Sequence, residues 1–222
     1  MVSRTWIVIP MYNEATVVAD VIKGLHSEFS NIVCIDDGST DGSPAIARAA
    51  GAVVVEHPVN LGQGAALQTG LQYALLDPAT TEIVTFDADG QHQVSDARDM
   101  VSRIRSGEAD VVLGSRFLDD RTQVSALKRL VLRVAALQSR MATGMALTDA
   151  HNGLRAFDSG TAAKINLTQN RMAHASELIH QLSDIKPRWV EHPVKIIYTD
   201  YSKAKGQSLL NSVNILADLL FR

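Results

Sequence analysis

The sequence has only one cysteine, and no run of apolar residues approaches the ~20 that a helix needs to cross a bilayer. A single thiol, Cys34, excludes a disulfide framework and a cysteine metal site. Near the N-terminus there is no hydrophobic region of signal-peptide length and no small-residue cleavage site. The net charge of -3 gives no general reason to expect a nucleic-acid partner. We therefore expect a cytoplasmic protein that does not bind nucleic acid.

The chain does have enough apolar residues for one sizeable core, since 46% of its 222 residues are hydrophobic. No repeat, low-complexity run or linker marks a boundary, so we expect residues 1–222 to form one domain. Short β-branched runs alternate with stretches of helical apolar spacing, which predicts an α/β fold with a largely parallel sheet covered by helices on both faces. The predicted strands are 5–9, 31–36, 52–56, 83–86, 110–114, 154–158 and 189–198. The predicted helices are 15–26, 44–50, 64–75, 95–106, 122–148, 173–184 and 209–221.

The stretch from Glu82 to His92 joins a predicted buried strand to two carboxylates. Side chains alternate along a strand that advances about 3.3 Å per residue, so Asp87 and Asp89 would project the same way, roughly 6 to 7 Å apart. With Gln91 just beyond, this pair suits a hard divalent cation that takes oxygen ligands. A polar turn that caps the strand is the alternative interpretation. Ligands bind at the carboxyl ends of parallel strands. The loops predicted at that edge are 10–14, 36–41, 60–64 and 87–91.

Residues 122–148 contain no acidic residue, and four basic ones lie among apolar positions at helical spacing. A basic amphipathic helix can lie on an anionic membrane surface, although a docked helix with a solvated basic face fits the pattern as well. The apolar segment 209–221 either packs on the body or touches lipid. These segments favour a peripheral location on the cytoplasmic face of the membrane.

Motifs along the chain resemble one known family in order and spacing. The first four are IPMYNE at 9–14, IDDGSTDGS at 35–43, NLGQGAALQTG at 60–70 and FDADGQH at 86–92. Together they resemble the inverting glycosyltransferases of family 2, which have the GT-A fold. The later motifs are GSRF at 114–117, TDAHNGLRAF at 148–157, SELIHQL at 176–182 and YTDYSKAKGQS at 198–208. They extend the resemblance, over nearly the whole chain, to the polyprenyl-phosphate sugar transferases of the dolichyl-phosphate mannose synthase group.

The resemblance implies a single Rossmann-like GT-A domain, with residues 1–115 binding a UDP- or GDP-sugar and residues 116–222 binding the acceptor. Asp36 would hydrogen-bond the base, although a turn at a strand end is the better interpretation of Asp36 and Asp37 when they are taken alone. Lys203 and Lys205 would belong to a loop that closes over the diphosphate. The residues implied in nucleotide-sugar binding are Pro10, Tyr12, Glu14, Asp36, Asp37, Gly62, Gly64, Asp87, Lys203 and Lys205.

The resemblance also assigns the metal ion. Asp89 matches the principal metal-binding carboxylate, and Asp87 and Gln91 would help around a Mg²⁺ or Mn²⁺ ion and the diphosphate. Such an ion would neutralise the charge that builds on the leaving nucleotide.

The acceptor implied is a polyprenyl phosphate, whose ionised oxygen can attack without a protein base. Arg116 and Arg155 match the arginines that bind the acceptor phosphate, although each could equally form a structural ion pair. An acceptor hydroxyl on a glycan is the first alternative and needs a general base, for which Asp149 or His151 could serve. His151 also fits a polar loop residue. The other histidines have no zinc spacing, and we interpret His57, His92, His174, His180 and His192 as structural or solvent-facing.

Two further functions fit the sequence less well. A nucleotide-binding module without catalysis could act with a membrane-protein partner, but the intact Asp87, Asp89, Arg116 and Arg155 argue against it. A dinucleotide oxidoreductase would carry its glycine fingerprint after the first strand, which here ends in PMYNE. The sequence leaves the number of chains in the assembly, including a homo-oligomer, open.

Overall fold

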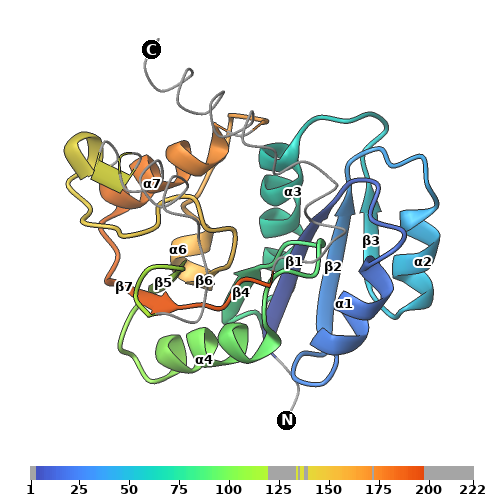
Figure 1. Cartoon of the computed structure of the whole chain (residues 1–222), viewed down its shortest axis with the longest axis horizontal. Coiled ribbons are helices and arrows are strands. Elements are labelled where there is room, and N and C mark those ends of the chain that lie inside the picture. The colour runs from blue at the N-terminus through green and yellow to red at the C-terminus, as the bar shows by residue number, and fades with distance from the viewer. Residues whose placement is uncertain (1–3, 120–133, 135, 138–139, 172, 198–222) are drawn as a thin grey trace.

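The computed structural model describes residues 4–119, 134, 136–137, 140–171 and 173–197. A seven-stranded sheet forms its centre, with strand order β3-β2-β1-β4-β6-β5-β7 (Figure 1). The strands are β1 (Thr5–Met11), β2 (Asn31–Asp36), β3 (Val53–Glu56), β4 (Glu82–Thr85), β5 (Val111–Ser115), β6 (Arg155–Asp158) and β7 (Trp189–Pro193). The predicted α/β class with a mostly parallel sheet is confirmed.

Strand β6 is the exception to the parallel arrangement, because it runs antiparallel to both of its neighbours, β4 and β5. The pairs β1 with β2, β1 with β4, β2 with β3 and β5 with β7 are parallel. The reversal brings the start of β6, at Arg155, opposite Thr85 at the end of β4. A residue from the second half of the chain thus reaches the carboxyl edge of the first half.

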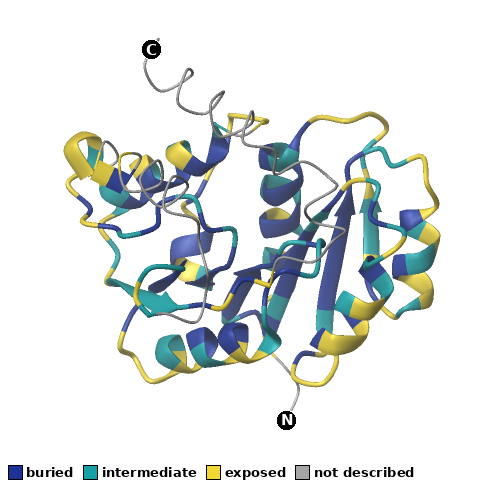
Figure 2. Cartoon of the chain, in the orientation of Figure 1, coloured by how far each residue is buried: buried dark blue, intermediate teal, exposed yellow. Residues whose placement is uncertain are grey.

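Helices cover both faces of the sheet, and the alternation of side chains along β1 shows how. Ile7 and Ile9 are fully buried against residues of α1, α2 and α4, whereas Val8 is buried against residues of α3, α6 and α7. Figure 2 shows the buried strands between these two layers. The helices are α1 (Val18–Leu25), α2 (Ser43–Ala49), α3 (Gln63–Leu75), α4 (Val94–Arg105), α6 (Ser159–Ala162) and α7 (His174–Ile185).

Two points of the sequence prediction need correction. The last predicted strand ends at Pro193 rather than Tyr198, because its partner β5 ends at Ser115, which pairs with Pro193. The short helix α6 was not predicted. It is capped by Asp158, whose side chain accepts a hydrogen bond from Thr161 N–H at 2.7 Å.

The predicted helix 122–148 lies largely outside the described residues, as do segment 209–221, Lys203 and Lys205. Residues 140–143 are helical, and 144–147 are not. Gly144 has φ +74 and donates its N–H to the carbonyl of Arg140, which is a common way for a helix to end. Within the part of the chain that the structure describes, no helix has the length and apolar character needed to cross a membrane.

Candidate functional site

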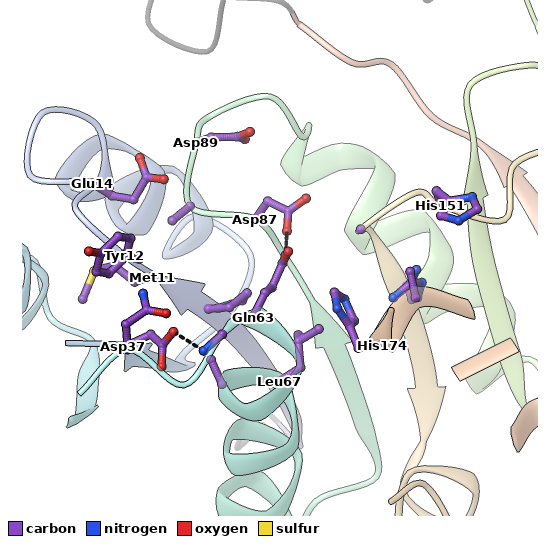
Figure 3. A pocket seen from close by; sticks show the side chains of 18 residues that line it. Met11, Tyr12, Glu14, Asp37, Gln63, Leu67, Asp87, Asp89, His151 and His174 are labelled. Carbon is purple, nitrogen blue, oxygen red and sulfur yellow. Dashed lines mark hydrogen bonds between the residues drawn. The ribbon is translucent and has the colours of Figure 1, made fainter. Parts of the chain in front are cut away.

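The carboxyl edge of the sheet holds a cavity of about 460 Å³, and the predicted loops meet there (Figure 3). The predicted site residues that line it are Pro10, Tyr12, Glu14, Asp37, Gly62, Asp87, Asp89 and Arg155, together with His151. Asp36, Gly64, Gln91, Arg116 and Asp149 do not line it. The other lining residues are Met11, Asn60, Gln63, Ala66, Leu67, Ala88, Gly153, His174 and Ala175.

The loops that follow β1 and β2 are held together by polar contacts. The backbone N–H of Glu14 donates to the hydroxyl of Ser43 at 2.7 Å, and the N–H of Thr40 donates to the side-chain oxygen of Asn13 at 2.9 Å. Asn13 itself has φ +54, a left-handed conformation that asparagine tolerates better than most residues. These contacts fix the wall that carries Tyr12 and Glu14.

Asp37 holds the loop before α3 against β2. Its carboxylate accepts the N–H groups of Leu61 at 2.9 Å and Gly62 at 2.7 Å, and its Oδ1 lies 2.9 Å from Nδ1 of His57. The carboxylate therefore has a structural task in addition to its place on the cavity wall. Nothing in the sequence identified His57 as its partner.

Asp36 is buried beside this wall. One oxygen accepts the N–H of Ser39 at 3.0 Å, and the other, Oδ1, has no hydrogen-bond partner among the residues that the structure describes. A buried carboxylate oxygen without a donor is costly. Asp36 thus retains an unused acceptor where the resemblance implied a contact with the base.

Gly62 and Gly64 allow close approach, but the group that approaches them is protein backbone. A Cβ at Gly62 would lie 2.2 Å from the carbonyl oxygen of Asn170, and one at Gly64 would lie 2.0 Å from that of Gln169. Gly64 also donates its N–H to Asn170 at 2.8 Å. These glycines therefore dock the start of α3 onto the segment before α7.

Asp87 and Asp89 lie in the middle of the cavity. Strand β4 ends at Thr85, so both carboxylates belong to the following loop rather than to the strand. Burial opposes ionisation of Asp87, but a hydrogen bond from His92 and nearby positive charge outweigh it and lower its pKa. Burial and the charge of Asp87 together raise the pKa of Asp89 to about 6. Two carboxylates thus share one small space.

This donor set fits a divalent cation. The raised pKa of Asp89 reflects burial and repulsion from Asp87, and a cation between the two would relieve that repulsion. Among the described residues no cluster of three His, Cys, Asp or Glu side chains could bind a metal, so phosphate and water oxygens would complete the shell. Gln91 contributes through its backbone, since its N–H donates to Oδ1 of Asp89 at 3.1 Å.

Two side chains orient Asp87. His92 places Nε2 2.9 Å from Oδ2, and Gln63 donates from Nε2 to Oδ1 at 3.2 Å (Figure 3). An ionised carboxylate only accepts, so His92 carries its proton on Nε2. Its Nδ1 is then buried without a partner among the described residues. Neither side chain was singled out by sequence reasoning, although the adjacency of His92 to the acidic motif was a signal.

Arg155 lines the cavity and is 3% exposed. Burial lowers the pKa of its guanidinium to about 10, and the charges of Asp87 and Asp149 counteract part of that effect. No ion pair or side-chain hydrogen bond to Arg155 occurs within the ranges that the structure describes.

Two histidines of the cavity wall feel the charge of Arg155. Burial is the main cause that lowers the pKa of His174, to about 4, and the charge of Arg155 is the second. The same two causes lower the pKa of His151.

Arg116 and Asp149 form a buried pair outside the cavity wall. The guanidinium donates to both carboxylate oxygens, from Nε at 2.6 Å and from Nη2 at 2.7 Å, and the backbone N–H of Arg116 adds a third bond at 3.1 Å. Burial opposes ionisation of Asp149, but Arg116 outweighs it and lowers the pKa. Two of the four residues predicted as catalytic, Arg116 and Asp149, are thus joined to each other, whereas the other two, Asp89 and Arg155, line the cavity.

Comparisons with known proteins agree with this geometry. The model of the family described as glycosyl transferase family 2 matches residues 6–158. An uncharacterised protein of Methanocaldococcus jannaschii is 34% identical over 98% of this chain and 91% of its own length. The UDP-N-acetylglucosamine–dolichyl-phosphate N-acetylglucosaminyltransferase of Methanococcus voltae is 29% identical over 97% and 94%.

Among solved structures, glucosyl-3-phosphoglycerate synthase from Mycobacterium tuberculosis, in complex with Mg²⁺ and UDP, superposes with a TM-score of 0.74. It is 20% identical and covers 97% of this chain and 78% of its own, which supports the predicted GT-A fold. From the family match and the relatives together, this chain belongs to glycosyltransferase family 2.

Proposed function

We propose that this enzyme is a metal-dependent inverting hexosyltransferase that moves a hexose from a UDP- or GDP-sugar to a polyprenyl phosphate. The observation that carries the proposal is that one cavity holds two ionisable carboxylates, Asp87 and Asp89, and a buried cation, Arg155, that has no ion-pair partner among the described residues. The carboxylates suit a metal-bound diphosphate and the cation suits a second phosphate. The name of the Methanococcus voltae relative, which acts on dolichyl phosphate, supports this choice of acceptor.

The donor would be held by the half of the chain before residue 116. Tyr12 and Glu14 line the end of the cavity where the nucleoside would bind, and Asp36, which is buried behind that wall, would have to become accessible for its unpartnered oxygen to reach the base. Asp87 and Asp89 would hold Mg²⁺ or Mn²⁺, which supplies a Lewis acid for the leaving diphosphate. The Mycobacterium tuberculosis structure contains Mg²⁺ and UDP, which supports this pairing of ion and nucleotide.

The acceptor would be bound by residues of the second half, 116–222. Arg155 can donate two parallel hydrogen bonds to a phosphate monoester and orient one oxygen toward the anomeric carbon. Such an oxygen is ionised at neutral pH and needs no protein base. The acceptor's negative charge would also offset the buried charge of Arg155.

The alternative, a glycan hydroxyl as acceptor, would need a base. Asp149 is poorly suited to that task because three donors of Arg116 occupy its oxygens and lower its pKa. We therefore place Asp149 as the partner that holds Arg116.

A third proposal is contact with a membrane, and it rests on the basic segment 122–148, which has no acidic residue. Sedimentation of the protein with anionic vesicles tests it, because we expect the protein to sediment with the vesicles at low salt and to be released at high salt.

A transfer assay tests the acceptor. The enzyme is incubated with Mn²⁺, labelled UDP-glucose, UDP-N-acetylglucosamine or GDP-mannose, and either undecaprenyl phosphate or undecaprenol. We expect label in the lipid extract with the phosphate and none with the alcohol. Equal transfer to the alcohol, or transfer only to an oligosaccharide, would contradict the phosphate acceptor.

A further inference from the structure

His174 presents an unused hydrogen-bond acceptor to the cavity. It begins helix α7, is 3% exposed, and lines the cavity (Figure 3), as Arg155 also does. Sequence reasoning assigned it a structural or solvent-facing place. The structure places it on the wall of the candidate site, where it lines the cavity.

The hydrogen bonds of the ring define which nitrogen is available. Nδ1 lies 2.7 Å from the carbonyl oxygen of Arg171, and a carbonyl can only accept, so Nδ1 carries the hydrogen. The low pKa of His174, about 4, keeps the ring neutral at pH 7. Nε2 therefore bears a lone pair. The bond of Nδ1 to Arg171 is the side-chain hydrogen bond that His174 makes within the described part of the chain, so no described group donates to Nε2.

The position of His174 in the cavity predicts a contact with the transferred sugar. Figure 3 shows Tyr12, Glu14 and Asp37 on one side of the cavity, Asp87 and Asp89 between, and His174 on the other side, before His151. A nucleotide sugar is arranged in the same order: nucleoside, diphosphate, hexose. With the diphosphate at the two carboxylates, the hexose falls next to His174.

The chemistry of Nε2 distinguishes it from Arg155. A lone pair accepts a hydrogen bond from a hydroxyl group but repels an ionised phosphate oxygen, whereas a guanidinium binds the phosphate. The two neighbours thus suit different ligands, a hexose hydroxyl and an acceptor phosphate.

We propose that His174 is a specificity-determining residue that accepts, through Nε2, a hydrogen bond from a hydroxyl of the hexose carried by the nucleotide sugar. This inference rests on the proposed function, because it requires a nucleotide sugar in the cavity. It adds a sugar contact that lies outside the acidic motif and on a different element.

Two variants separate this role from a structural one. His174→Asn keeps an N–H near the position of Nδ1 for the carbonyl of Arg171 and removes the acceptor at Nε2. His174→Gln loses that N–H and places an amide oxygen near Nε2. A structural role predicts that Asn is the milder change, whereas sugar recognition predicts that Gln is.

The measurement is calorimetric titration, with Mn²⁺, of UDP, UDP-glucose, UDP-N-acetylglucosamine, GDP and GDP-mannose, accompanied by the melting temperature of each variant. For His174→Asn we expect the Kd of the free nucleotide to stay within about 2-fold of wild type and the Kd of the nucleotide sugar to rise roughly 5- to 10-fold. His174→Gln should lie nearer to wild type for the nucleotide sugar.

Three other outcomes would overturn the inference. Equal nucleotide-sugar affinity in wild type and His174→Asn overturns the inference alone. A loss of kcat with donor affinity unchanged also overturns it, since His174 would then act on the acceptor. If the wild type binds no nucleotide at all, both the proposed function and this inference are wrong.

Discussion

Gly153 lies so close to Asp87 that a Cβ placed on it would fall 2.2 Å from Oδ2 and 2.9 Å from Oδ1 of that carboxylate. The glycine immediately precedes Leu154 and β6, the reversed strand, and its carbonyl accepts the hydroxyl of Thr85 at 2.8 Å. The second half of the chain therefore forms one wall of the space in which Asp87 must sit. Any side chain at residue 153 would compete with the carboxylate for that space.

Gly153→Ala should accordingly impair the metal site. Overpacking costs about 1–3 kcal/mol, and the simplest relief is a shift of Asp87. We expect weaker Mn²⁺-dependent nucleotide binding, measured by titration calorimetry. Gly160→Ala is the matched control, since its Cβ would meet nothing nearer than 3.6 Å. Unchanged Mn²⁺ dependence in Gly153→Ala would show that Asp87 does not need this space.

Asp89→Asn should separate function from stability. The amide oxygen can still accept the N–H of Gln91, but the anionic ligand is lost, so Mn²⁺-dependent nucleotide affinity should fall by more than about 10-fold. The pKa of Asp89 is raised to about 6 in the folded protein, so its charge opposes folding above that pH.

The metal-free Asp89→Asn variant should therefore melt at a higher temperature than wild type at pH 8, in EDTA. The difference should vanish below about pH 4, where the carboxyl group is protonated in both the folded and unfolded states. A variant that is less stable than wild type at pH 8 would contradict the repulsion between Asp87 and Asp89.

Asp149→Asn should destabilise the fold. It leaves the buried charge of Arg116 without its carboxylate, a change that costs about 3–5 kcal/mol. Urea unfolding measures this cost, with Asp110→Asn in the exposed pair with Arg188 as a control expected to cost under about 1 kcal/mol.

The pH dependence gives a second check on Asp149. The pKa of Asp149 is lowered in the folded protein. Its contribution to the free energy of unfolding is therefore fully present above the pKa of the unfolded state, near 4, and is lost as the pH falls through the pKa of the folded state. A stable Asp149→Asn variant that retains donor binding but loses kcat would instead favour a role for Asp149 as a base.

Arg155→Met should affect the acceptor and not the donor. Methionine fills much of the same volume, and loss of a buried cation that has no ion-pair partner in the described ranges should not lower the melting temperature. We expect the KM for undecaprenyl phosphate to rise by more than about 10-fold, because hydrogen bonds to charged groups are lost. The Kd of the donor should change by less than about 2-fold. Arg98→Met, at an exposed site on α4, should change neither. An unaltered KM in Arg155→Met would exclude Arg155 from acceptor binding.

Much of the fold could be predicted because its signals are local. The β-branched run at Asn31–Asp36 matches β2 at both ends, and the apolar spacing of α1 and α3 identified helices whose bounds differ by a few residues. The reversal of β6 was not predicted, because strand direction depends on the path of the chain between β5 and β6 rather than on the residues of Arg155–Asp158.

The site was predictable where its residues form a motif. Asp87 and Asp89 are two residues apart in the sequence and meet in the cavity, whereas His174 has no neighbour in the sequence that marks it. Its availability depends on the carbonyl of Arg171 and on burial beside Arg155, and both are tertiary facts. Gly62 and Gly64 were assigned to the ligand, but what requires them is the backbone at 169–170.

Calorimetric titration of the purified protein with UDP and with GDP, each with and without Mn²⁺, tests most directly the claim that Asp87 and Asp89 organise a nucleotide-sugar site. We expect one of the two nucleotides to bind and its binding to depend on Mn²⁺. Binding of neither nucleotide, or binding that is indifferent to Mn²⁺, would contradict it.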